Sequence, residues 1–480
     1  MPGFLIKIHI CFTLYYLHCG ENLKTMRRAS RLFADSPVLY QKGTTLHRLC
    51  KNIDIKDVNT VLPYVEDCIR RHWKRHDFRD LLASHGMKRN DYYMLKDMEE
   101  AYSIGGIPQE SQADFMKRLG EKRTEYHKAV KSIAIDACER IRSRKPGLKP
   151  VTIRKRRDGA SGKERLIGCE SAMQQVLDAI AVGAAMPIFT RRMVPQQASS
   201  IQGRGQVYGV RTIRRWIRKD NAAMRYAKRH RLRYTPKCKY FVKLDIEKCY
   251  GSARKDIFMR LFKHDCGNDD LIWLWDYLLS THAVDGNKGF MIGALPSQWG
   301  AQYMLSFAYR YVKNLHFTRR GKAIKAVSHM IMFMDDMALF SSSRKALKSA
   351  VKSLAEYTHK TLGFVIKPTW HIKRLSECGL DMMGFVVHQS GKATIRGRNF
   401  IKARRMALRR LAGRRLCRKN AMRIMAYKGF FDNSDSREAA KGYHLKEIFN
   451  QAKQLIGAMV RKHNEQRRGQ LAYVYTGCTV

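Results

Sequence analysis

Three things are scarce in this sequence of 480 residues: acidic side chains, long apolar runs and paired cysteines. Only 41 Asp and Glu stand against 92 Lys and Arg, which gives a formal net charge of +51. A compact protein with that excess repels itself, so we expect a polyanionic partner. No apolar run reaches the length of about 18 residues that spans a membrane, so no membrane partner is expected. Nucleic acid is the expected polyanion, because binding to phosphates releases counterions.

The 12 cysteines are scattered singly along the chain, and no two of them form a C-x-x-C pair. The sequence therefore predicts neither a zinc ribbon nor a disulfide framework. Single thiols in a large chain are mostly small core residues, which favours a reducing, cytoplasmic setting. The 17 histidines show no ligand spacing, so we interpret them as structural.

The composition and the spacing of apolar residues change along the chain and suggest four regions. Residues 1–25 have an interrupted apolar run without a small-residue cleavage pattern, and we treat them as a leader of uncertain role. Residues 26–150 show helical spacing of apolar side chains, which predicts a helical N-terminal extension. Residues 151–390 alternate short β-rich segments with helices and predict an α+β region. Residues 391–480 predict a basic, helical C-terminal domain.

Three carboxylates mark the α+β region. Asp335 and Asp336 lie side by side in the apolar stretch HMIMFMDDMALF, which predicts a hairpin with the acidic pair at its turn. Asp245 ends the apolar strand YFVKLD, and pairing of that strand with the hairpin would bring the three carboxylates to one sheet edge. Like charges at such an edge resist ionisation unless cations lie between them.

Magnesium suits this set of oxygen ligands, with Mn²⁺ as its substitute. Two ions about 4 Å apart would activate a primer 3′-hydroxyl and stabilise a leaving pyrophosphate. We therefore expect Asp245, Asp335 and Asp336 to be catalytic and to ligate two Mg²⁺ ions.

Several short segments follow one another in a fixed order between residues 150 and 430. They are RKRRDG with KERLIG, QGRGQ, DIEKCY, IGALPSQ, FMDD, TLGFVIKP and DMMGFVV. In this order they resemble the reverse transcriptases of the bacterial, non-retroviral kind, which include group II intron, retron and diversity-generating enzymes. The resemblance implies an RNA-directed DNA polymerase with a right-hand architecture of fingers, palm and helical thumb. It also implies an RNA template, a DNA product and dNTPs as substrates.

The resemblance assigns roles around the incoming nucleotide. Arg165, Lys163 and Lys155 would hold the triphosphate from a fingers hairpin. Tyr250, five positions after the first catalytic carboxylate, would leave no room for a 2′-hydroxyl and so select deoxynucleotides. Lys367 would approach the pyrophosphate.

Two further segments would contact the template and primer. Gly293, Ser297 and Gln298 belong to an I-G-x-x-x-S-Q box that would shape the template-base pocket. Many bacterial enzymes have Q-G-x-x-x-S-P there, and the form seen here resembles diversity-generating, defence-associated and unclassified reverse transcriptases. The turn Met383–Phe385, with Gly384 between them, resembles the primer grip.

Three biological roles are compatible with these motifs. We favour antiphage defence with a dedicated non-coding RNA, because the region 26–150 is larger than a minimal diversity-generating enzyme needs. A diversity-generating retroelement enzyme is the alternative, and a catalytically silent RNA-binding scaffold is another. Intact Asp245, Asp335 and Tyr250 argue against the scaffold. The template, the primer, a partner protein and the oligomeric state are not fixed by the sequence.

Overall fold

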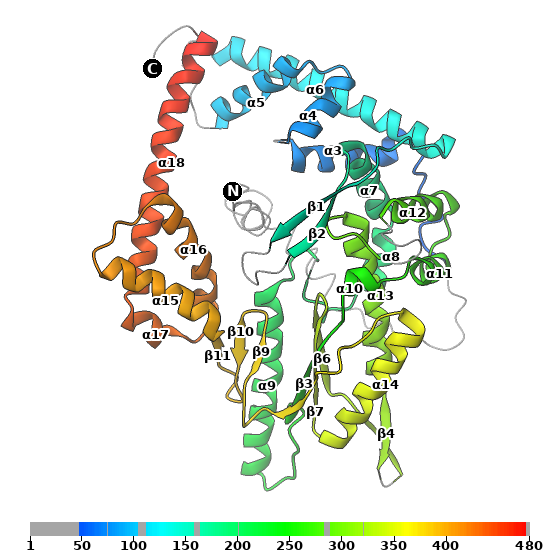
Figure 1. Cartoon of the computed structure of the whole chain (residues 1–480), viewed down its shortest axis with the longest axis vertical. Coiled ribbons are helices and arrows are strands. Elements are labelled where there is room, and N and C mark those ends of the chain that lie inside the picture. The colour runs from blue at the N-terminus through cyan, green and yellow to red at the C-terminus, as the bar shows by residue number, and fades with distance from the viewer. Residues whose placement is uncertain are drawn as a thin grey trace.

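The computed structural model describes residues 48–476 without residues 74, 104–111, 158–163, 200, 283–288 and 320. The expected leader at 1–25 and Lys163 therefore lie outside the described residues. Within the described ranges, helices and strands are mixed, as the α+β prediction requires (Figure 1).

From residue 48 onward, four helices precede the first described strand: α3 (Val58–His72), α4 (His76–Ser84), α5 (Arg89–Ser103) and α6 (Gln112–Ser143). Helix α3 begins at Asp57, whose carboxylate accepts a hydrogen bond from the Thr60 amide at 2.9 Å and so caps the helix. The buried faces of these helices pack into one hydrophobic core with α7 (Ala172–Ala184) and with the central sheet. The predicted helical region is thus part of the main packed body.

A hairpin of β1 (Thr152–Arg157) and β2 (Glu164–Cys169) follows, with antiparallel pairing, as its sequence predicts. The chain then forms α7, α8 (Met186–Arg192) and α9 (Gln206–Arg229). Among the described residues no single helix is long and apolar enough to span a membrane. The bent pair α7 and α8 passes that test on length and composition, but most of its apolar side chains are buried in the core.

The central sheet has four antiparallel strands in the order β6-β7-β3-β8. Their bounds are Tyr240–Asp245 for β3, His329–Phe333 for β6, Asp336–Ser341 for β7 and Ile372–Arg374 for β8. Side chains alternate between the two faces of the sheet. Val242 and Leu244 join the core beneath α14 (Arg344–Leu362), whereas Phe241 and Phe340 pack with α9 on the other face (Figure 1).

The hairpin turn between β6 and β7 differs by one residue from the prediction. Phe333 pairs with Asp336, so the two turn residues are Met334 and Asp335. Met334 has a φ of 55°. Asp336 is the first residue of a strand, and its backbone belongs to the ladder.

The remaining elements of this region connect the sheet strands. They are α10 (Cys249–Ser252), α11 (Lys255–Asp265), α12 (Asp269–His282), α13 (Leu295–Lys313), β4 (His316–Arg319) and β5 (Lys322–Lys325). Aromatic residues recur every four positions along α13, at Trp299, Tyr303, Phe307 and Tyr311, and this helical spacing predicts core packing. Tyr303 is fully buried, and its hydroxyl hydrogen-bonds the Asp265 carboxylate at 2.7 Å, which confirms that prediction for Tyr303.

A small sheet of β9 (Leu380–Met382), β10 (Phe385–Val387) and β11 (Ala393–Ile395) leads to the C-terminal helices. Strands β9 and β10 form a hairpin through Met383 and Gly384. Both turn residues have a positive φ, 56° and 85°, as a tight two-residue hairpin turn of type I′ requires.

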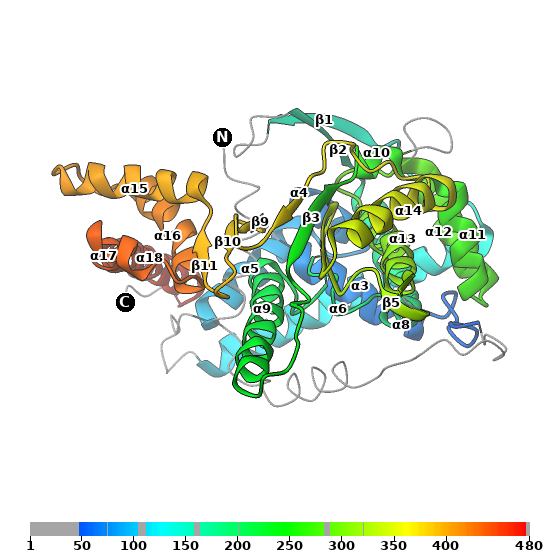
Figure 2. The ribbon, with the colours of Figure 1, turned by 90° about the horizontal axis from the view of Figure 1, so that it is seen from below.

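Helices α15 (Gly397–Leu411), α16 (Arg418–Asp432), α17 (Arg437–Gly442) and α18 (Leu445–Thr476) complete the chain. They have a separate hydrophobic core and lie to one side of the central sheet (Figure 2). Helix α18 runs from this cluster to α5, which it contacts (Figure 1). No strand follows residue 395 in the described part of the chain, in agreement with the sequence.

Candidate active site

The three predicted carboxylates meet at one edge of the central sheet. Asp245 is the last residue of β3 and lies directly opposite Asp336, the first residue of β7. Asp335 immediately precedes Asp336 in the turn, and its carbonyl accepts a hydrogen bond from the Ile246 amide at 3.4 Å. The expected convergence is therefore present in the structure.

Two lysines accompany the outer carboxylates. The Lys367 ammonium hydrogen-bonds Asp245 Oδ2, and the pairing raises the pKa of Lys367. Lys243 Nζ lies 3.1 Å from Asp336 Oδ2. The resemblance predicts Lys367 near the leaving pyrophosphate. No motif marks Lys243, which is a polar residue between Val242 and Leu244 in β3.

Asp335 is half-buried, as are Asp245 and Asp336. Burial is the main cause that raises the pKa of its carboxyl, and the charges of Asp336 and Asp245 add to the effect. The positive charge of Arg165, from the β1–β2 hairpin, lowers the pKa of Asp335. A cation beside Asp335 would offset the cost of burying this carboxylate in its charged form.

This donor set fits divalent cations. Three carboxylates at one end of the sheet supply the oxygen ligands that Mg²⁺ prefers, and a bound Mg²⁺ keeps positions for water or substrate oxygens. The ammonium of Lys367 at Asp245 shows that the edge already accommodates a positive charge. Asp245 and Asp335 are the expected principal ligands, and Asp336 is the expected supporting carboxylate.

Tyr250 lies near these carboxylates, as the sequence predicts. Its short helix α10 follows Lys248, which has a left-handed φ of 43°. The Tyr250 carbonyl accepts a hydrogen bond from the Phe290 amide at 2.6 Å, which ties this helix to the loop before α13. Burial raises the pKa of Tyr250 to about 12, and the charge of Asp335 contributes.

The hairpin register separates two of the predicted triphosphate ligands. Arg165 is directly opposite Arg156, whereas Lys155 is opposite Leu166. Cross-strand partners share a face and neighbours along a strand alternate, so Arg165 and Lys155 lie on opposite faces. The positive charge of Arg165 acts on Asp335, so we expect its face of the hairpin to be the one toward the carboxylates. Lys155 is exposed on the other face.

The predicted template-pocket box packs against β2. The Gly168 amide donates a hydrogen bond to the Ile292 carbonyl at 3.0 Å. Gly293 has a φ of +116°, and a Cβ there would lie 3.0 Å from the Gly168 carbonyl oxygen. Glycine is therefore required by both conformation and close approach. Ser297 is fully buried in α13, and Gln298 is half-buried near the helix start.

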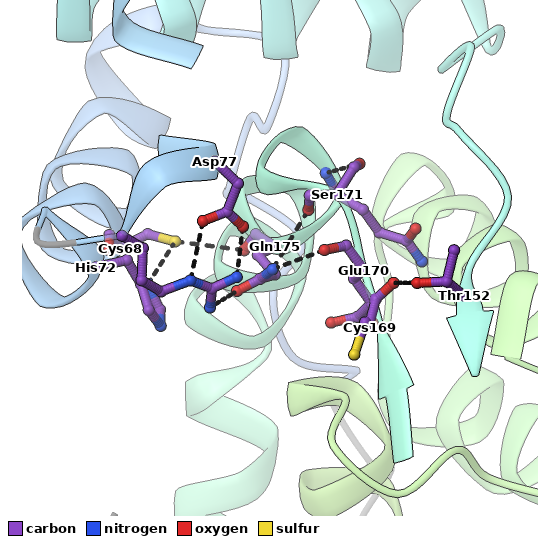
Figure 3. Close-up of polar contacts among 10 residues, drawn as sticks. Cys68, His72, Asp77, Thr152, Cys169, Glu170, Ser171 and Gln175 are labelled. Atoms are coloured by element: carbon purple, nitrogen blue, oxygen red, sulfur yellow. Dashed lines mark hydrogen bonds and ion pairs between the residues drawn. The ribbon is translucent and has the colours of Figure 1, made fainter. Parts of the chain in front are cut away.

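Contacts from the N-terminal helices hold the base of the hairpin (Figure 3). The Gln175 side chain accepts a hydrogen bond from Arg75 at 2.9 Å and donates one to the Glu170 carbonyl at 3.0 Å. Arg75 is itself paired with Asp77. The thiol of Cys68, from α3, donates to the Gln175 carbonyl at 3.4 Å. Helices α3 and α4 thus help to fix the hairpin that carries Arg165.

The predicted primer-grip turn is buried in this structure. Met383 and Phe385 are 4% and 1% exposed, and Gly384 is buried between them. A Cβ on Gly384 would lie 2.5 Å from the Phe430 ring of α16, and Met383 packs against Gly209 of α9. The turn therefore joins the central region to the C-terminal helices, and its side chains do not form an exposed surface.

One further cationic surface lies on α9. A cavity of about 530 Å³ is lined by Arg211, Arg214, Arg215, Arg218, Lys219 and Ala222. Two of these side chains also bind the C-terminal part of the chain: Arg214 pairs with Asp435 at 2.6 Å and Arg211 bonds Asn433 at 2.9 Å. The surface suits a polyanion.

Carboxylates that converge at a sheet edge, near an arginine from another element, point to the class of enzymes that transfer nucleotidyl groups. The family model described as reverse transcriptase (RNA-dependent DNA polymerase) matches residues 153–370. The match contains every candidate residue from Lys155 to Lys367. The chain therefore carries the domain of an RNA-directed DNA polymerase, a nucleotidyltransferase.

Comparison with solved structures gives a more distant likeness. The chain is similar to a structure of apo telomerase from Candida tropicalis, truncated from its C-terminal domain, with 11% sequence identity and a TM-score of 0.34. The alignment covers 74% of this chain and 85% of the other. A likeness at this level carries no inference about function. No curated protein matches the sequence.

Proposed function

We propose that the chain synthesises DNA on an RNA template, adding deoxynucleotides to a 3′ end or to a protein hydroxyl. The observation that carries the proposal is the position of Asp245 opposite Asp336, with Asp335 in the adjoining turn, inside the reverse transcriptase domain. In this proposal the central sheet is the palm, the β1–β2 hairpin belongs to the fingers and helices α15–α18 form the thumb.

Asp245 and Asp335, supported by Asp336, would hold two Mg²⁺ ions. The ions would activate the attacking hydroxyl and stabilise the leaving pyrophosphate. Lys367 balances the Asp245 carboxylate in the substrate-free site and is close enough to meet the negative charge of the leaving group. Arg165 approaches from the facing hairpin and would bind the triphosphate, an oxygen-rich group that suits a guanidinium.

Tyr250 would select the sugar. Its half-buried position beside Asp335 supports a steric role, because a ring held in place there would collide with a 2′-hydroxyl. Gly293 and Gln298 would contact or shape the template-base pocket, with Ser297 acting from inside the core. The buried Met383–Phe385 turn would support the primer side by placing the C-terminal helices.

The nucleic-acid duplex would follow basic surfaces. Helix α15 presents exposed Arg404, Arg405 and Arg409, while its small residues Ala403 and Ala407 face the core. Such contacts to phosphates position a duplex without reading its sequence. Binding by this chain would therefore weaken steeply as the salt concentration rises.

For the biological role, we propose antiphage defence with a dedicated non-coding RNA as template. The support is the I-G-x-x-x-S-Q box and the helices α3–α6, which pack against the polymerase domain. A diversity-generating role would be supported by a variable and template repeat pair in the neighbouring DNA. Finding such a pair would overturn the defence proposal, and sequencing the nucleic acids that co-purify with the protein would identify the template.

The polymerase proposal is tested with purified full-length protein, a primed RNA template, Mg²⁺ and dNTPs. The expected product is DNA complementary to the template. The silent-scaffold alternative predicts RNA binding without a DNA product. Treatment of the product with a protease distinguishes the two kinds of priming. DNA attached to a protein hydroxyl changes its mobility, whereas DNA extended from the 3′ end of a nucleic-acid primer does not.

A further inference from the structure

A second cluster of metal-ligand side chains lies at the base of the β1–β2 hairpin. Glu170 follows β2 directly, Asp178 lies in α7, and His282 ends α12. One ligand atom from each residue lies within 4.8 Å of the others. The Glu170 and His282 side chains are 4% and 0% exposed, and Asp178 is 1% exposed.

The polar atoms of this cluster are poorly satisfied. Neither carboxylate oxygen of Asp178 has a hydrogen-bond partner, although both are buried. His282 Nε2 lies 2.6 Å from Glu170 Oε1 and also 3.1 Å from Gln174 Nε2, so two groups compete for one ring nitrogen. A buried carboxylate without a partner is costly, which indicates that a ligand or a proton belongs here.

A shared proton explains only part of this arrangement. Burial and the neighbouring Glu170 raise the pKa of Asp178, so one proton between the two carboxyl groups removes a charge. It satisfies one Asp178 oxygen and leaves the other without a partner. A divalent cation in contact with both carboxylates and with the His282 nitrogen neutralises the two negative charges together.

We propose that Glu170, Asp178 and His282 bind a structural transition-metal ion, with Zn²⁺ as the best fit. Zinc accepts imidazole nitrogen and carboxylate oxygen at about 2.0–2.2 Å, so two ligand atoms of a tetrahedral site lie roughly 3.5 Å apart. The three ligand atoms of the cluster lie within 4.8 Å of one another, so small shifts of the side chains would bring them to that spacing. Magnesium is disfavoured, because it prefers oxygen ligands and retains several waters.

The ion would join three elements at the base of the hairpin. Glu170 leaves the strand that carries Arg165, and it is fixed from the other side by Gln175, which hydrogen-bonds its carbonyl (Figure 3). Asp178 anchors the site to the buried helix α7, and His282 anchors it to α12. The cluster uses none of the residues of the proposed polymerase site, so this proposal does not depend on DNA synthesis.

The test measures metal bound to full-length protein produced with added Zn²⁺ and then dialysed. We expect one equivalent of zinc per chain, and its loss in Asp178→Asn and His282→Gln. Asp335→Asn, which removes a carboxylate of the sheet edge, is the matched control and keeps the zinc. Replacement of zinc by Co²⁺ should give the visible absorption of a nitrogen- and oxygen-ligated ion.

Three results would overturn the proposal. Wild-type protein without zinc that also gives no Co²⁺ spectrum contradicts it, and so does zinc that stays bound in Asp178→Asn. If the variants do not fold, X-ray absorption at the zinc edge of the wild-type protein decides. Nitrogen and oxygen neighbours support the site, whereas sulfur neighbours place the ion on cysteines and contradict it.

Discussion

Asp245 and Asp336 face each other across the ladder of β3 and β7, and each carboxylate is paired with a different lysine. Lys367 pairs with Asp245 and Lys243 pairs with Asp336. Asp335, in the turn from β6 to β7, carries the raised pKa that burial and the charges of Asp336 and Asp245 cause. This arrangement distinguishes the three carboxylates and leads to different expectations for each.

Asp245→Asn should abolish primer extension, with a loss of at least about 1,000-fold, because a metal ligand supplies several kcal/mol of transition-state stabilisation. Asp336→Asn should lose less, because Asp336 begins the strand β7 and we assign its carboxylate a supporting role beside the two principal ligands. Rates of single-nucleotide addition on an RNA template measure both. Glu356→Gln, an exposed carboxylate of α14, is the control and should extend at the wild-type rate. Equal losses in Asp245→Asn and Glu356→Gln would refute the assignment.

Arg165→Ala should raise the KM for dNTPs by about 10- to 150-fold, the range expected when a hydrogen bond to a charged group is lost. Lys155→Ala is the matched variant from the opposite face of the same hairpin, and its KM should change less than about threefold. Steady-state kinetics with varied dNTP concentration compare them. The hairpin assignment fails if Lys155→Ala has the larger effect.

Tyr250→Ala should admit ribonucleotides, reducing the preference for dNTP over rNTP by about 10- to 100-fold, because the steric block is removed. Tyr250→Phe should keep the preference, since the ring supplies the block and the hydroxyl stays protonated with a pKa of about 12. Competition between dCTP and CTP measures the ratio. An unchanged ratio in Tyr250→Ala would show that Tyr250 is only a packing residue.

Asp335→Asn should stabilise the metal-free protein at neutral pH. A carboxyl with a pKa raised in the folded state stabilises the fold only while it is protonated, and that contribution is lost as the pH rises through the raised value. Thermal unfolding in EDTA should therefore show a higher Tm for Asp335→Asn at pH 7. The difference should shrink as the pH approaches about 4, near the ordinary pKa of Asp. Added Mg²⁺ should raise the Tm of the wild-type protein more than that of the variant. A wild-type protein that is the more stable of the two in EDTA at pH 7 would contradict this account.

Gly293→Ala should destabilise the protein by about 1–2 kcal/mol through its positive φ, and should also displace β2. The added methyl group would press on Gly168 of β2, so the KM for dNTPs should rise as Arg165 moves. Gly429→Ala in α16 is the control: no atom lies within 4 Å of the added carbon, and alanine favours the helix. Denaturant unfolding compares the two. Similar stability of both variants would show that the Gly293 contact is unimportant.

The sequence predicts the order of helices and strands correctly where the spacing of apolar residues and the order of the motifs indicate the same element. The β1–β2 hairpin, the strand ending at Asp245 and the helical C-terminal region are all present. The sequence places Asp335 and Asp336 at the hairpin turn, whereas the structure has Met334 and Asp335 there. The difference of one residue arises because Phe333 pairs with Asp336 in the ladder. Register depends on contacts between strands, which local sequence does not encode.

Other features depend on residues that are distant in the chain. The burial of Met383 and Phe385 results from packing against α9 and α16, and a turn motif alone does not show it. The sequence does not predict the cluster of Glu170, Asp178 and His282, because these residues are not spaced as in a metal-binding motif. The histidines were interpreted as structural, and only the fold brings His282 to the two carboxylates.

The most direct test of the central claim is extension of a primed RNA template by the wild-type protein and by Asp335→Asn, both purified as full-length chains with Mg²⁺ and dNTPs. We predict that the wild-type protein makes complementary DNA, whereas the folded variant makes none above background. An Asp335→Asn protein that extends the primer at the wild-type rate would contradict the account.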